Sequence, residues 1–301
     1  MTGTPRVAVV VVSFESRDTL VAALASVRAH AGLPFETVVV DNASGDGSAE
    51  AVRAADPEAL VIANSRNTGF AHACNQGWRA ARAPFVLFLN PDAEVTAGAI
   101  PSLVELLESR ADVGAAGPRT RNSDGSIQVS TGPDLGLLAE RRQRRLVLGV
   151  ARRDPRSVAG AEARHAREHE PGWISGACLM ARRSALESVR GFDEGFFLYE
   201  EDADLCLRLR RAGWRVVFTP AAEVRHRLGH SMSRSPARAR IEYHRSHLRY
   251  YRKHGGSASR TALRLLLAGR GAWGWLRGAA AGNEARRAEG AALVRLSLGG
   301  R

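Results

Sequence analysis

The sequence predicts an α/β protein with a doubly wound, mostly parallel sheet flanked by helices, followed by a basic helical extension. Two observations carry this prediction. Aliphatic runs alternate with helical segments over the first 118 residues, which is the pattern of repeated β-α-β units. The region after residue 236 is rich in arginine and opens on a long helical segment, residues 237–254. We therefore expect a main domain over residues 1–235 and an extension over residues 236–301.

The expected elements follow one another closely in the first half of the chain. Residues 7–14 form an aliphatic run typical of a strand buried on both faces. Further strands are expected over residues 37–40, 60–63, 85–89, 113–116 and 215–219, with regular structure resuming over residues 173–181. Helices are expected over residues 17–30, 71–82, 100–110 and 201–212, and also after a cap at Ser48 and from Ser184. Residues 120–171 interrupt this alternation with glycine, proline and charged residues, so we interpret them as a variable insertion. It separates a first half, about residues 1–118, from a second half, about residues 172–235.

Composition and charge narrow the class of protein. Hydrophobic residues make up 45% of the chain, which is enough for a sizeable core, and the net charge is +12. A basic half is typical of proteins that bind nucleotide phosphates, nucleic acid or anionic membranes, although a genome-wide bias towards arginine and alanine gives the same composition. The three cysteines form no CxxC pair, which favours a reduced, cytoplasmic setting. No apolar run reaches 18 residues, so we expect no membrane-spanning helix.

Three residues near the ends of predicted strands are candidates for binding. Asp41 closes the second strand and Asp92 follows the fourth, at the sheet edge where open parallel sheets bind ligands. Asp41 is suited to a nucleobase or ribose, and Asp92 to a divalent metal that bridges two phosphates. His226 follows the last strand and is a candidate third member of a metal site. Each aspartate also fits a turn that merely closes a loop, and the histidine fits a structural role. No glycine-rich phosphate loop is present, so metal and side chains would have to neutralise a bound nucleotide.

Four carboxylates crowd at the start of one predicted helix. They are Glu200, Glu201, Asp202 and Asp204. The helix dipole favours acidic residues there by about 0.3–1 kcal/mol each, which accounts for one or two of them. Four together repel one another, which indicates a nearby cation or a proton-transfer task. A carboxylate in this place is suited to accept the proton of an attacking hydroxyl.

Short segments in a fixed order link these residues to a known family. They are SF at 13–14, VVVDNAS at 38–44, NTGFAHACN at 67–75, FLNPD at 88–92, SGA at 175–177, GFDEGFF at 191–197, EDADLCLR at 201–208 and VRH at 224–226. With this ordered set, over about residues 6–232, the chain resembles the family 2 glycosyltransferases of the GT-A fold, particularly the bacterial rhamnosyltransferase-like branch. The resemblance identifies residues 1–235 as a GT-A catalytic domain.

The resemblance implies a role for each matching residue. The donor-binding residues would be Ser13, Asp41, Asn67, Gly69, Asn75, Asn90 and Asp92. Asp92 would bind Mg²⁺ or Mn²⁺ with His226, and Asn90 replaces the first acid of the family's DxD motif. Asp202 would be the catalytic base, with Glu201 as its neighbour.

The implied reaction is a single in-line displacement by an inverting glycosyltransferase. Asp202 would take the proton of the acceptor hydroxyl as that hydroxyl attacks the anomeric carbon, while the metal stabilises the departing diphosphate. The branch suggests dTDP-rhamnose as donor and a glycan or lipid-linked acceptor. Two other functions stay open: a metal-dependent nucleotidyltransferase, and a basic nucleic-acid-binding protein. The basic residues lack interleaved aromatics, so we expect no nucleic-acid partner.

Residues 257–281 suggest a contact with a membrane. They combine leucine, tryptophan and arginine, as do segments that lie in a membrane interface. Gly269, Gly271 and Gly274 predict two short helical pieces there. The leucines could instead pack on the catalytic domain. With a lipid-linked acceptor, we expect peripheral contact with the anionic inner face of the plasma membrane.

Overall fold

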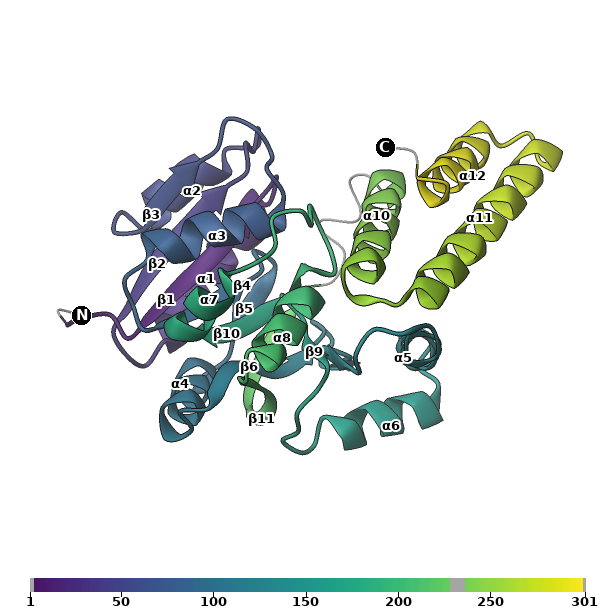
Figure 1. Cartoon of the computed structure of the whole chain (residues 1–301). Helices are drawn as coiled ribbons and strands as arrows, with labels where there is room; N and C mark the ends of the chain where they lie inside the picture. The colour runs from purple at the N-terminus through teal and green to yellow at the C-terminus, as the bar shows by residue number, and fades with distance from the viewer. Residues whose placement is uncertain (1–2, 228–235, 300–301) are drawn as a thin grey trace. The chain divides into compact units, whose positions relative to one another are not determined.

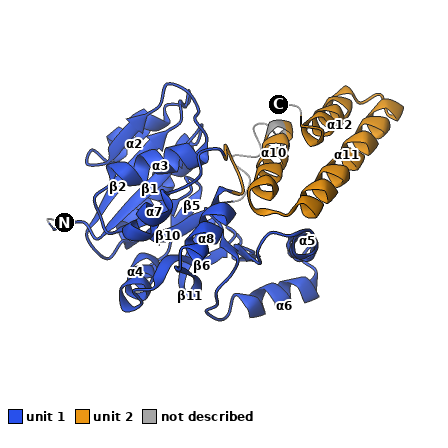
Figure 2. Cartoon of the chain, in the orientation of Figure 1, with its two compact units in different colours: residues 1–195, 201–231 blue, residues 196–200, 232–301 orange. Residues whose placement is uncertain are grey.

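The computed structural model describes residues 3–227 and 236–299, and Figure 1 shows the order of the elements. The chain forms two compact units (Figure 2). Unit 1 comprises Met1–Gly195 and Glu201–Ser231, and unit 2 comprises Phe196–Glu200 and Met232–Arg301. Phe196–Glu200 therefore belongs to unit 2, although it lies in the middle of the chain.

The core of unit 1 is a mixed sheet. Its strand order is β3-β2-β1-β4-β10-β6-β11-β5, with β7 beside β6. These strands are β1 (Val7–Ser13), β2 (Phe35–Asp41), β3 (Leu60–Ala63), β4 (Phe85–Leu89), β5 (Ala93–Val95), β6 (Val113–Arg121), β7 (Ile127–Gln128), β10 (Cys178–Arg182) and β11 (Arg215–His226). The block from β3 to β4 is parallel, as is the β6–β11 pair, whereas β10 and β5 run antiparallel to their neighbours. Every residue of β1 is buried, as expected for a strand covered on both faces.

The helices of unit 1 are amphipathic where they pack on this sheet. They are α1 (Arg17–His30), α2 (Ser48–Ala55), α3 (Phe70–Ala80), α4 (Ala99–Ser109), α5 (Leu137–Ala151), α6 (Pro155–Arg164), α7 (Arg183–Val189) and α8 (Glu201–Arg211). On α1, the buried residues Leu20, Leu24 and Val27 recur at helical spacing. Ser48 is the first residue of α2 rather than its cap. Gly47 holds the cap position, and Asp46 accepts hydrogen bonds from the backbone nitrogen and hydroxyl of Ser48.

The segment interpreted as an insertion contains regular structure. It holds α5, α6, β7 and β8 (Thr131–Gly132), and β8 pairs with β9 (Trp173–Ile174). None of the residues of α5 is buried, so this helix contributes nothing to the core. The glycine, proline and charged residues of this segment did not indicate the two helices α5 and α6.

β11 is longer than predicted and has two partners. It pairs parallel with β6 from Arg215 to Arg225, and the register shifts between Thr219 and Glu223. The last residues, from Val224 to His226, pair antiparallel with β5, where His226 lies opposite Ala93. This pairing brings His226 next to Asp92, the residue that precedes β5.

Unit 2 contains three helices within its described residues: α10 (Pro236–His254), α11 (Ser257–Ala280) and α12 (Glu284–Ser297). The prediction of two short pieces over residues 257–281 is wrong, because α11 is one continuous helix. Two of its glycines, Gly271 and Gly278, allow close packing against α12. A Cβ atom on Gly271 would lie 2.7 Å from the carbonyl oxygen of Gly290, and one on Gly278 would lie 2.8 Å from the nitrogen of Arg287. The contact offsets the cost of glycine in a helix, about 1 kcal/mol per residue.

Across residues 3–227 and 236–299, no helix is both long enough and apolar enough to cross a membrane.

Candidate active site

Asp92 and His226 lie side by side at the end of the sheet. Oδ1 of Asp92 is 3.1 Å from Nε2 of His226, and both side chains are largely buried. The backbone nitrogen of Arg227 donates to the carbonyl oxygen of Asp92, which fixes the two chain segments together. Two predicted metal ligands, 134 residues apart in the sequence, are thus brought into contact.

The protons on His226 decide what this pair can bind. Nδ1 lies 2.8 Å from Oε1 of Gln128, an acceptor, so Nδ1 carries a proton and donates it. In the neutral ring Nε2 is then an acceptor that faces a carboxylate. Two acceptors approach this closely only when they share a cation, either a proton or a metal ion. One carboxylate oxygen and one imidazole nitrogen therefore fit a divalent cation.

Among residues 3–227 and 236–299, no third carboxylate or histidine joins this pair as a metal ligand. Nδ2 of Asn90 lies 3.4 Å from Nε2 of His226, which places this amide beside the same point. Within the described part of the chain, no three His, Cys, Asp or Glu side chains converge as a metal site. A cation held by Asp92 and His226 would need other oxygen ligands, such as phosphate oxygens or water.

Asp202 is held by the segment that also contacts Asn90. The backbone nitrogen of Gly176 donates to Oδ2 of Asp202 at 2.9 Å, and that of Ala203 lies 2.8 Å from Oδ1. The carbonyl oxygen of Ala177 accepts from the backbone nitrogen of Asn90 at 2.9 Å. Three segments singled out in the sequence therefore meet, with SGA linking FLNPD to the acidic start of α8.

The crowded carboxylates at this helix start have different surroundings. Asp204 is fully buried and pairs with Arg208, with 2.6 Å between Oδ2 and Nε. Within unit 2, Oε1 of Glu200 lies 3.0 Å from Nδ1 of His247. Asp202 is the only one of the four that is not buried. Asp202 is therefore the carboxylate best placed to meet a substrate hydroxyl.

The thiols take no part in this chemistry. Burial raises the pKa of the Cys178 and Cys206 thiols to about 12. Burial, followed by the charge of Glu201, raises the pKa of Cys74 well above its usual value. The three thiols therefore stay protonated at neutral pH and are poor nucleophiles and poor metal ligands.

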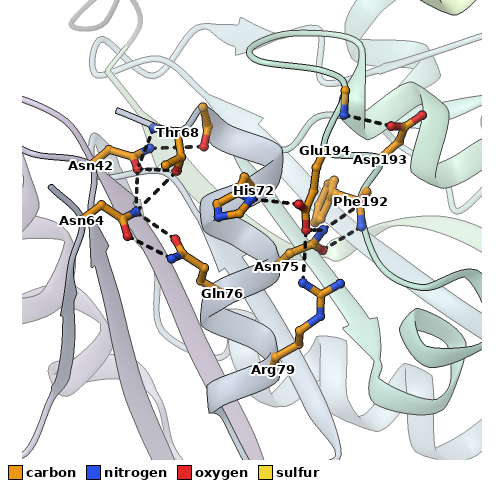
Figure 3. Close-up of polar contacts among 12 residues, drawn as sticks. Asn42, Asn64, Thr68, His72, Asn75, Gln76, Arg79, Phe192, Asp193 and Glu194 are labelled. Atoms are coloured by element: carbon orange, nitrogen blue, oxygen red, sulfur yellow. Dashed lines mark hydrogen bonds and ion pairs between the residues drawn. The ribbon is translucent and has the colours of Figure 1, made fainter. Parts of the chain in front are cut away.

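The predicted nucleotide end of the site is organised around Asn42, which the sequence analysis passed over. Its Nδ2 donates to the carbonyl oxygen of Gly69, and its Oδ1 accepts from Thr68 and Asn64 (Figure 3). Asn64 and Gln76 exchange two further hydrogen bonds. This amide network holds the NTG segment against the carboxyl end of β2. The signal for it was the position of Asn42, directly after a buried strand.

Several predicted donor-binding residues have their polar atoms occupied by the protein. Both carboxylate oxygens of Asp41 accept hydrogen bonds from Ser44, so the turn role considered from the sequence is present. Ser13 is fully buried, and its hydroxyl lies 2.9 Å from that of Ser16. Oδ1 of Asn67 accepts from the nitrogen of Gly69, a glycine with φ of 88° that begins α3. These residues shape the backbone at the sheet edge.

Asn75 is a structural tie rather than part of an open surface. It is fully buried, and its Nδ2 donates to the carbonyl oxygen of Phe192 and to Glu194, while its Oδ1 accepts from the Phe192 nitrogen (Figure 3). The same oxygen also accepts from Nε1 of Trp78. Burial alone would raise the pKa of Glu194, but hydrogen bonds from Asn75, His72 and Arg79 outweigh it and lower that pKa. Asn75 thus connects α3 to the GFDEG segment.

The fold agrees with comparisons with known proteins. The family model described as Glycosyl transferase family 2 matches residues 8–190, and Glycosyl transferase family group 2 matches residues 157–277. The chain belongs to glycosyltransferase family 2 and is an inverting glycosyltransferase. Family membership does not favour a nucleotidyltransferase or a nucleic-acid-binding protein.

Two curated relatives carry rhamnosyltransferase names. The chain is 35% identical over 251 residues to the N-acetylglucosaminyl-diphospho-decaprenol L-rhamnosyltransferase of Mycobacterium tuberculosis, a match that covers 79% of this chain and 81% of the relative. It is 45% identical over 58 residues to the rhamnosyltransferase WbbL of Escherichia coli, covering 19% of this chain and 22% of that one.

Solved structures support the fold. The mannosyltransferase PcManGT from Pyrobaculum calidifontis, solved with GDP-Man and Mn²⁺, has a TM-score of 0.60 and 20% identity, covering 99% of this chain and 87% of that one. GalNAc-T7, solved with UDP, GalNAc and Mn²⁺, has a TM-score of 0.57 and 17% identity, covering 82% of this chain and 48% of that one. The predicted GT-A fold is confirmed.

Proposed function

We propose that this glycosyltransferase moves rhamnose from dTDP-rhamnose to a lipid-linked glycan acceptor. The observation that carries the proposal is the similarity to the Mycobacterium tuberculosis enzyme, whose name specifies rhamnose and a diphospho-decaprenol acceptor, over four-fifths of both chains. Residues 1–235 would form the catalytic domain, and residues 236–301 would contact the membrane that holds the acceptor.

Asp202 acts as the general base in this proposal. Its carboxylate, held by the nitrogen of Gly176, accepts the proton of the acceptor hydroxyl. The hydroxyl oxygen forms its bond to the anomeric carbon while the bond from that carbon to the diphosphate breaks, and dTDP leaves. One displacement inverts the anomeric configuration. Glu201 is the buried neighbour of Asp202 at the start of the helix.

Asp92 and His226 hold the divalent cation in this proposal, with Asn90 beside them. When bound, Mg²⁺ or Mn²⁺ supplies positive charge to the departing diphosphate. The contact of two acceptor atoms at 3.1 Å supports the assignment, and the presence of Mn²⁺ in two structures of the same fold is consistent with it. The turns at Asp41 and Asn67, with Ser13 and Gly69, form the floor for the nucleoside.

A donor screen tests the proposed substrate. Purified enzyme, Mn²⁺ and an N-acetylglucosaminyl-diphospho-polyprenol acceptor would be incubated with dTDP-rhamnose, UDP-glucose, UDP-N-acetylglucosamine or GDP-mannose. We expect acceptor-dependent release of dTDP from dTDP-rhamnose at least about tenfold faster than release of nucleotide from the other donors, a margin of about 1.4 kcal/mol in transition-state binding. Faster turnover of another donor would transfer the assignment to that sugar and leave the enzyme class intact.

We also propose that α11 lies on an anionic membrane surface, at the cytoplasmic face. Leu265, Leu266, Trp273 and Leu276 are between 54% and 68% exposed, and their spacing places them on one face of the helix. Leu263 and Leu267, by contrast, are buried within unit 2.

The chemistry around this exposed face favours lipid as its partner. Trp275 and Leu276 help to line a shallow apolar hollow of about 480 Å³ that extends onto α12. Arg270 and Arg277 are exposed on the same helix, and Lys and Arg far outnumber acidic residues after position 236. Exposed aromatic and aliphatic side chains beside arginines fit a headgroup boundary, where each arginine contributes about 1 kcal/mol with anionic lipid.

Vesicle co-sedimentation tests this surface. We expect the full chain to sediment with phosphatidylglycerol vesicles at low salt and to be released as salt is raised. The triple variant Leu265→Glu, Trp273→Glu, Leu276→Glu should lose at least about tenfold in apparent affinity, because three charges then enter the interface. Leu138→Glu, at an equally exposed leucine of unit 1, is the matched control and should bind like the parent. If the triple variant binds vesicles like the parent, this surface does not contact lipid. If the parent forms a dimer without vesicles and the triple variant does not, the surface is instead a contact between two copies of the chain.

A further inference from the structure

Gln128 lies in the segment interpreted from the sequence as an insertion, yet its side chain reaches the proposed metal pair. It belongs to β7, which forms a short antiparallel hairpin with the end of β6. In this hairpin Thr120 pairs with Gln128, and Arg121 pairs with Ile127. Oε1 of Gln128 is 2.8 Å from Nδ1 of His226. The site that the sequence predicts includes no residue of this segment.

The orientation of the Gln128 amide is set by a chain of hydrogen bonds that starts at the carboxylate of Asp124. Ser126 donates its hydroxyl proton to Asp124, so the hydroxyl oxygen is left to accept from Nδ2 of Asn122 at 2.9 Å. Oδ1 of Asn122 then accepts from Nε2 of Gln128 at 3.0 Å. Oε1 of Gln128 therefore faces the imidazole, which must donate.

The carboxylate at the start of this chain stays ionised. Side-chain and backbone hydrogen bonds from Ser126 lower the pKa of Asp124, and Arg153 lies 2.9 Å from it. An ionised carboxylate only accepts hydrogen bonds, so it fixes the direction of each bond that follows. The backbone of the hairpin is fixed as well, because the backbone nitrogen of Asn122 donates a hydrogen bond to the carbonyl oxygen of Ser126 at 2.9 Å.

We infer that Gln128 is a positioning residue, which holds His226 in the tautomer protonated at Nδ1 and so leaves Nε2 available to a divalent cation beside Asp92. The inference rests on the proposed metal role of Asp92 and His226. In the opposite tautomer, the unprotonated Nδ1 would face the Gln128 oxygen at 2.8 Å, with acceptor against acceptor, and the Nε2 proton would be hydrogen-bonded to Asp92 in place of the metal. Hydrogen bonds of this kind to the second nitrogen of a ligating histidine typically change metal affinity by about 10–100-fold.

Two variants separate the acceptor function of Gln128 from its bulk. Gln128→Leu removes the acceptor and keeps much of the volume, whereas Gln128→Glu keeps an acceptor at the same place. Gln143→Leu is the matched control, because Gln143 is a glutamine of the same segment that is hydrogen-bonded to Thr131 and Arg164. Urea unfolding of each variant verifies that it is folded.

Mn²⁺ binding is measured by electron paramagnetic resonance in the presence of dTDP. We expect Gln128→Leu to bind Mn²⁺ about 10–100-fold more weakly than the parent, with Gln128→Glu within about threefold of it and Gln143→Leu unchanged. Parental affinity in folded Gln128→Leu would overturn the inference, as would equal losses in the Leu and Glu variants.

The tautomer is measured without metal, which separates this inference from the proposed function. Histidine ¹⁵N spectra are recorded at increasing pH until the His226 signals no longer change, and those signals are assigned by their loss in His226→Gln. We expect the parent to carry its proton on Nδ1 and Gln128→Leu to move it partly or wholly to Nε2. An unchanged tautomer in Gln128→Leu overturns the inference. A tautomer that changes in a protein without measurable Mn²⁺ affinity supports Gln128 as a positioning residue and contradicts the metal role.

Discussion

Asp202→Asn is expected to lower kcat by about 10²–10⁴-fold while leaving the affinity for the nucleotide donor within about threefold. An amide cannot take the proton of the attacking hydroxyl. Its oxygen can still accept the hydrogen bond from Gly176, so the local structure is expected to persist. The measurement combines dTDP release under saturating substrates with donor binding by calorimetry.

Asp204→Asn is the control for this experiment. It lies two residues away on the same helix but is fully buried in an ion pair with Arg208, so its loss is expected to lower stability rather than kcat. Near-normal turnover by Asp202→Asn would exclude it as the base and make Glu201 the next residue to test.

Asp92→Ala is expected to lower kcat by about 10²–10³-fold and to abolish the Mn²⁺ dependence of dTDP binding. The substitution removes one of the two close protein ligands and leaves His226 alone, so charge on the departing diphosphate is stabilised poorly. Treatment of the parent enzyme with a chelator should reproduce the loss, and added Mn²⁺ should reverse it. Asp112→Ala, an exposed aspartate paired with Arg215, is the control.

The outcome of chelation decides the metal assignment. If chelation leaves both dTDP binding and turnover of the parent unchanged, Asp92 and His226 do not hold a catalytic metal. The replacement of the first DxD acid by Asn90 would then be the chemical reason, because an amide adds no negative charge to the site.

The strands of the parallel block could be predicted almost to the residue. Leu60–Ala63 and Phe85–Leu89 were expected with the bounds that the structure has, because short aliphatic runs between turn residues define them. The same logic placed Asp41 and Asp92 at one sheet edge. It could not show that the Asp41 carboxylate is committed to Ser44, because that depends on the conformation of a four-residue turn.

The remainder depended on contacts that leave no local pattern. No residue of α5 is buried. In α11, Gly271 and Gly278 are accommodated within one helix because they pack against α12, and this contact cannot be read from the sequence of α11 itself. Gln128 is an unremarkable glutamine in a polar stretch. Its importance arises only when β7 is folded back on β6 and β11 delivers His226, which lies 98 residues further along the chain.

The register shift within β11 has a consequence for how the length of this strand can vary. Side chains on a strand alternate between faces, so gaining or losing one residue between Thr219 and Glu223 would turn the last three residues of β11 over. His226 would then face away from Asp92, although neither residue had been altered. Evolution is therefore freer to change the identity of the side chains in this short stretch than its length. Sequence alignments of relatives should show gaps on either side of it more readily than inside it.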